Sequence, residues 1–160
     1  MNRRSVLARR SARQLTALLL TAIAVAAHGA STPIDDSGTV VLTPTVKMGW
    51  QTPVPRGHAN TQMTGTAPVR VRLNVTPWLR RAGRIYLLLP AQQPGSIRAS
   101  WTTQGRLLPG QIVSGTRVLV YSGPITTPFI EDLLQLSIVV DGRQMNQAYD
   151  INFRFEMDSL

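Results

Sequence analysis

The chain has 160 residues, of which 43% are hydrophobic and none is cysteine, and this length fits one ordinary domain. The lack of cysteine excludes disulfide frameworks, zinc–thiolate clusters and thiol catalysis. The formal net charge is +9, but five of the 17 basic residues lie in the first 13 positions. The rest of the chain has 12 basic and 8 acidic residues, which leaves a net charge of +4.

The N-terminus has the three-part layout of a secretory signal. A basic head is followed by an apolar run from Leu15 to Ala27 and by small residues at Ala27 and Gly29. We expect residues 1–29 to be removed, with cleavage after Gly29 or, nearly as plausibly, after Ala27. A membrane anchor is the alternative, but a spanning helix needs about 20 apolar residues and this run is shorter.

The expected location is the periplasm or the extracellular space. Two arginine pairs, Arg3–Arg4 and Arg9–Arg10, leave the twin-arginine route open, although no cofactor motif supports it and the general route is favoured. The later basic residues are dispersed except for Arg80, Arg81 and Arg84. We therefore expect neither nucleic acid nor, after cleavage, a membrane as a partner.

Upstream of position 66, one strand-like run extends from Thr39 to Met48 and is interrupted by Pro44. Proline confines such a run to a sheet edge or places it outside the sheet. Residues 51–68 contain many Pro and Gly and predict a long segment with no element of its own. The predicted organisation is a signal peptide over 1–29, a strand plus a flexible segment over 30–65, and a β-sandwich domain over 66–160.

Two interpretations of the Thr39–Met48 run remain open. It folds back as the first strand of its own sheet, or it is an arm that pairs with an exposed edge of another subunit. The candidate partner-binding residues are its apolar members: Val40, Val41, Leu42 and Val46.

From Thr66 onward apolar residues recur with period two, which predicts strands. Val69, Val71, Leu73 and Val75 alternate with polar residues, and a ten-residue alternation runs from Tyr149 to Asp158. Between them lie five further candidate strands: 84–89, 97–103, 111–113, 116–121 and 134–140.

Turn residues recur about every ten positions between these runs, as at Pro94–Gly95, Pro109–Gly110 and Asp141–Gly142. This spacing is typical of an all-β, antiparallel, immunoglobulin-like sandwich of about seven or eight strands. One helical turn is expected before Leu134, with Thr127 as its cap and Pro128 at its first position.

Catalytic chemistry finds little support. His58, the one histidine of the exported part, lies in the Pro/Gly-rich segment, where nothing holds an imidazole in place. Glu131 and Asp132 are adjacent and would diverge in a helical turn. Asp35 and Asp36 lack the spacing of a calcium loop. We predict no catalytic residues, no metal and no cofactor, with a small hydrolase as the remote alternative.

The tryptophans suggest the other alternative, a carbohydrate-binding module. Trp101 follows Ile97 and Ala99 at period two and is expected to be buried, and Trp78 is expected to close the end of the sandwich. Only Trp50 is free to be a surface residue, so it is the candidate ligand-binding residue for a glycan.

The run Gly83–Leu87, followed by Trp101, Gly105, Gly115 and Val118–Tyr121, resembles sandwich modules attached to exported bacterial pilus and adhesion proteins. Chaperone-assisted pilins usually carry a disulfide, which this chain lacks, so no residue role is transferred. The expected function is that of a non-catalytic structural or protein-interaction module of the bacterial envelope or of a surface assembly, with edge-strand pairing or self-association as the contact.

Overall fold

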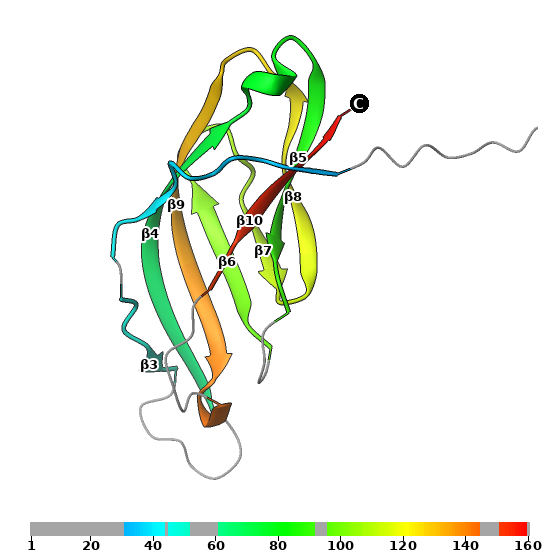
Figure 1. Ribbon diagram of the computed structural model, residues 1–160. Helices are drawn as coiled ribbons and strands as arrows, with labels where there is room; N and C mark the ends of the chain where they lie inside the picture. The colour runs from blue at the N-terminus through cyan, green and yellow to red at the C-terminus, as the bar shows by residue number, and fades with distance from the viewer. Residues whose placement is uncertain (1–30, 44, 52–60, 92–95, 145–150, 160) are drawn as a thin grey trace, which may run out of the picture.

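The computed structural model describes residues 31–43, 45–51, 61–91, 96–144 and 151–159. Within these ranges the chain forms ten strands and two short 3₁₀ helices (Figure 1). The strands are β1 (Thr32–Pro33), β2 (Val40–Val41), β3 (Gly49–Trp50), β4 (Gln62–Asn74), β5 (Ala82–Leu89), β6 (Arg98–Thr103), β7 (Gly110–Val113), β8 (Thr116–Pro124), β9 (Phe129–Asp141) and β10 (Arg154–Ser159). The 3₁₀ helices are η1 (Thr76–Trp78) and η2 (Gly142–Gln144).

The strands form two antiparallel sheets. The first has the order β1-β10-β5-β8, and the second has the order β2-β4-β9-β6-β7, with β3 also paired to β4. In Figure 1 the long pair β4 and β9 lies beside β6, while the red β10 runs diagonally across the view toward β5 and β8. The predicted fold class, an all-β antiparallel sandwich, is confirmed.

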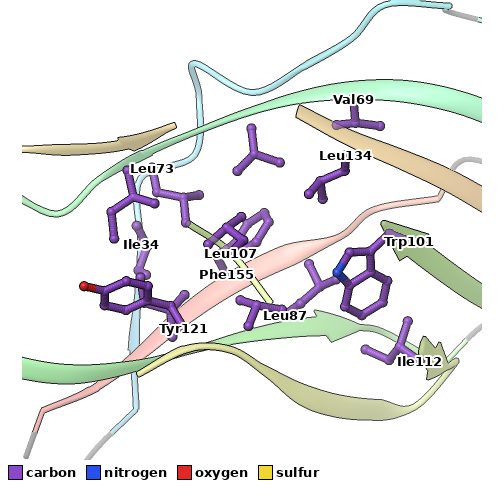
Figure 2. Packing of buried hydrophobic residues seen from close by; sticks show 14 of the residues in the cluster. Ile34, Val69, Leu73, Leu87, Trp101, Leu107, Ile112, Tyr121, Leu134 and Phe155 are labelled. Carbon is purple, nitrogen blue, oxygen red and sulfur yellow. The ribbon is translucent and has the colours of Figure 1, made fainter. Parts of the chain in front are cut away.

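The core lies between the two sheets and follows the predicted alternation. On β4, Val69, Val71 and Leu73 are buried, and on β10 Phe155 and Met157 are buried. Figure 2 shows side chains of both sheets meeting in one apolar layer, with Trp101 among them. Trp101 is 3% exposed, as its period-two position predicts, and Trp78 packs against the edge of the same cluster.

Strand β4 begins at Gln62, four residues before the predicted start, so the expectation of no element over 51–68 is wrong for residues 62–68. The proline that suggested a break, Pro68, directs its N and C=O toward β2, because the Leu42 N–H donates to the Pro68 C=O at 2.9 Å. The absent N–H therefore removes no bond to β9, and the strand continues through it.

The predicted helical turn at Thr127–Asp132 is also wrong. Strand β9 begins at Phe129 and pairs with β4 over its whole length, from Phe129 opposite Asn74 to Asp141 opposite Gln62. The residues that suggested a helix start, Thr127 and Pro128, lie in the bend just before β9, and Asp132 occupies an inward position of the strand. The last strand is shorter than predicted: β10 begins at Arg154, with the expected inward and outward phase.

Some expectations fall on residues outside the described ranges. These include the signal peptide over 1–29, the proline Pro44, the loop histidine His58, the turn at Pro94–Gly95, and the start of the Tyr149–Asp158 alternation.

Candidate interaction edge

Strand β2 lies at the edge of its sheet and is paired only with β4, with Val40 opposite Arg70 and Val41 opposite Val69. Strand β2 thus pairs with its own chain, as the first of the two interpretations expects. In Figure 1 it is the cyan trace beside β4, on the side away from β9.

The bonds that flank β2 fix which of its backbone groups point outward. Leu42 N–H donates to Pro68, so Val41 opposite Val69 is the non-hydrogen-bonded pair and Val40 opposite Arg70 is the hydrogen-bonded one. The N–H and C=O of Val41 therefore point away from β4. In the described part of the chain nothing bonds to them.

On the N-terminal side of Val40, a side chain continues the hydrogen bonding between this segment and β4. Thr39 Oγ1 accepts a hydrogen bond from the Arg72 N–H at 3.1 Å. The Thr39 N–H is used in a turn, where it donates to Asp36 C=O at 2.8 Å. Val41 is thus an outward-facing backbone position between two neighbours, Val40 and Leu42, whose N–H groups are both directed to β4.

The side chains around this position are apolar and uncovered. Val40 is 51% exposed, Val41 47% and Leu42 45%. Val40 lies on the outer face with Arg70, and Leu42 lies on the same face as Val40 because side chains alternate along a strand. We call Val40, Val41 and Leu42 the β2 edge.

Val46 does not belong to the β2 edge. It is half-buried, and a Cβ atom added to Gly65 would lie 2.6 Å from Val46 Cγ1 and 2.5 Å from Met48 Sδ. The chain after β2 therefore crosses close over the inner side of β4, and Gly65 provides the space. Of the four predicted partner-binding residues, the first three are thus exposed at the edge of the sheet and Val46 is not.

Trp50 lies in β3, opposite Met63, and is 44% exposed. The edge of its indole packs on the backbone of Gly142, because a Cβ there would lie 2.6 Å from Trp50 Cζ3 and Cη2. Trp50 is thus a half-exposed surface residue, and it lies near the start of β4, whereas β2 pairs with the middle of β4 at Val69 and Arg70.

The turn that leads into β2 carries two carboxylates with opposite pKa shifts. The hydrogen bond from Ser37 lowers the pKa of Asp35. Partial burial raises the pKa of Asp36 above its usual value. The segment that contains these two residues carries the chain from β1 in one sheet to β2 in the other. Ile34, just before Asp35, is buried in the core.

Other features were not predicted from the sequence. Phe129 is 40% exposed and lies under the Arg72 guanidinium, whose Cζ is 4.4 Å from the ring centroid. Asp132, which is 7% exposed, accepts hydrogen bonds from the N–H groups of Gln104, Leu107 and Leu133 at 3.1, 2.8 and 2.7 Å. The bonds from Gln104 and Leu107 fasten the loop between β6 and β7 to β9, so this carboxylate has a structural role.

Two acids of the last strand form ion pairs with one arginine. Glu156 and Asp158 share the outer face of β10, and both contact Arg117 of β8, at 3.7 and 2.5 Å. Arg117 also lies over the ring of Tyr86, with its Cζ 3.9 Å from the centroid. This arrangement is an ion-pair network across three strands.

Among the residues that the structure describes, no three His, Asp or Glu side chains are close enough together to hold a metal ion. In the same ranges no helix has the length and apolar character needed to cross a membrane. Comparison with family models, with curated proteins and with solved structures gives no match to this chain.

Proposed function

We propose that this chain is an exported, non-catalytic β-sandwich that serves as a structural or protein-interaction module of the bacterial envelope, and that its contact is the β2 edge. The observation that supports this most directly is the outward N–H and C=O of Val41, whose own side chain and those of its two neighbours are apolar and each about half exposed. An open strand edge is a template for another strand.

Natural sheets protect open edges with lysine, other charges or proline at the pairing positions. The β2 edge has none of these at positions 40 to 42. The nearest outward charge on β4 is Arg70, opposite Val40. An apolar edge without these protecting residues fits a surface that is covered in the assembled protein.

The Val41→Pro variant tests this function. Proline removes an N–H that β4 does not use, so the sheet retains its own hydrogen bonds, while an added strand loses one. In a pull-down from envelope extract we expect Val41→Pro to lose most of the captured protein and Trp50→Ala to retain it.

The reverse pattern would favour the glycan alternative, because Trp50 is the exposed indole. In that case Trp50→Ala would lose retention on a glycan column, whereas Val41→Pro would behave like the unmodified chain. Capture that neither substitution changes would contradict the β2 edge as the contact.

A further inference from the structure

We propose that the β2 edge pairs with the β2 edge of a second copy of this chain, antiparallel, about a two-fold axis through Val41. This rests on the proposed function and adds the identity of the partner. The pairing would join the two five-stranded paths into one sheet through the order β9-β4-β2-β2-β4-β9.

The hydrogen-bond pattern determines the register. Of the three residues of the β2 edge, Val41 alone directs both its N–H and its C=O outward, while Val40 and Leu42 direct theirs toward β4. Two copies can therefore exchange a pair of N–H···O=C bonds when Val41 faces Val41. A shift of one residue would place each outward group against a residue whose own N–H and C=O point toward β4.

The same register pairs the exposed side chains. When Val41 faces its copy, Val40 of each chain faces Leu42 of the other in a non-hydrogen-bonded pair, in which side chains approach most closely. Both residues lie on the outer face of the sheet, 51% and 45% exposed. Two identical apolar cross-strand pairs would thus form, and such pairs stabilise antiparallel sheets.

Charge does not oppose the contact. The three residues of the β2 edge are uncharged, and the nearest outward cation, Arg70, lies one strand further in. In the pair of copies the two Arg70 positions would be three strand spacings apart, roughly 14 Å. This exceeds the Debye length of about 8 Å at physiological ionic strength, so their repulsion is largely screened.

The contact is small because β2 has only two residues. Small interfaces are usually weak and transient, so we expect a dissociating dimer whose population rises with concentration. This concentration dependence can be followed by sedimentation velocity of the purified chain.

The first variant for that measurement is Val41→Pro, which removes both intermolecular N–H donors. We expect its dimer dissociation constant to rise at least about tenfold, with an unchanged melting curve because β4 loses no bond.

A pair of double variants tests the register itself. In V40K/L42K the two residues that face each other across the dimer repel, whereas in V40K/L42E they attract.

We expect V40K/L42K to be monomeric and V40K/L42E to dimerise, with a dimer that weakens as salt is added. All substituted side chains are about half exposed, so the fold tolerates them. A chain that stays monomeric at every concentration overturns the pairing, as does equal association of the two charged variants. If the monomeric chain still captures an envelope protein and Val41→Pro prevents this, the proposed function stands and only pairing with a second copy fails.

Discussion

Replacing Asp132 by alanine is expected to lower the free energy of unfolding by about 3 kcal/mol, because three backbone N–H groups lose their acceptor and a buried unpaired donor costs about 1–3 kcal/mol. For a domain whose total stability is of the order of 5–15 kcal/mol this is a large fraction. The measurement is denaturant unfolding followed by circular dichroism.

The neighbouring acid provides the matched control. Glu131 faces outward, is 63% exposed and forms a surface ion pair with Arg72 at 3.2 Å. Glu131→Ala should change stability by less than about 1 kcal/mol. Asp132→Asn should fall between the two, because it retains one acceptor oxygen. Equal unfolding midpoints for Asp132→Ala and Glu131→Ala would show that the carboxylate does not anchor the loop.

The second large effect is expected for Trp101→Ala, at about 3–5 kcal/mol, the range for truncation of a buried large aromatic side chain. Trp101 is 3% exposed, and its Nε1 donates to Leu108 C=O at 2.9 Å. Its indole also fills the space beside Gly110, where a Cβ would lie 3.0 Å from Cζ2. Thermal unfolding gives the readout.

One variant separates packing from the hydrogen bond, and a second serves as the exposed control. Trp101→Phe retains most of the apolar volume and should lose less stability than the alanine variant. Trp50→Ala, at a half-exposed position, should lose far less than either. A Trp101→Ala protein as stable as Trp50→Ala would contradict the placement of Trp101 in the core. Since Asp132 and Trp101 hold the same loop, their effects should not add.

The sandwich could be predicted because its strands obey a simple rule. Each of β4, β9 and β10 has one face toward the core and one toward solvent, so apolar residues recur with period two. Where residues depart from the rule, the prediction failed. Gly65 and Pro68 are residue types typical of loops. Gly65 makes room for the chain that crosses β4, and the Pro68 nitrogen, which carries no hydrogen, faces β2 at the edge of the sheet.

The helical turn predicted around Asp132 was wrong for a different reason. A charged residue at an inward position suggests a surface turn, because buried charges need partners. Its partners are backbone N–H groups up to 28 residues away in the chain, and the sequence alone gives no sign of them. Only the folded chain shows that the position is satisfied, and so the strand continues through it.

The candidate edge was predictable in part. Pro44 and the run of apolar residues before it indicated an edge strand, and Val40, Val41 and Leu42 are indeed exposed there. The inward turn of Val46 depends on Gly65, nineteen positions later, and periodicity within the run could not reveal it. Likewise, the outward direction of the Val41 groups follows from its register with β4 rather than from residue type.

Amide hydrogen exchange resolved at Val40, Val41 and Leu42 tests the central claim most directly. In the dilute chain we expect slow exchange at Val40 and Leu42, which are directed to β4, and fast exchange at Val41. In the assembled state, whether formed with a second copy or with a captured envelope protein, Val41 should become protected as well. A Val41 amide that is already slow in the dilute chain, or that stays fast in the assembled state, would contradict strand pairing at this edge.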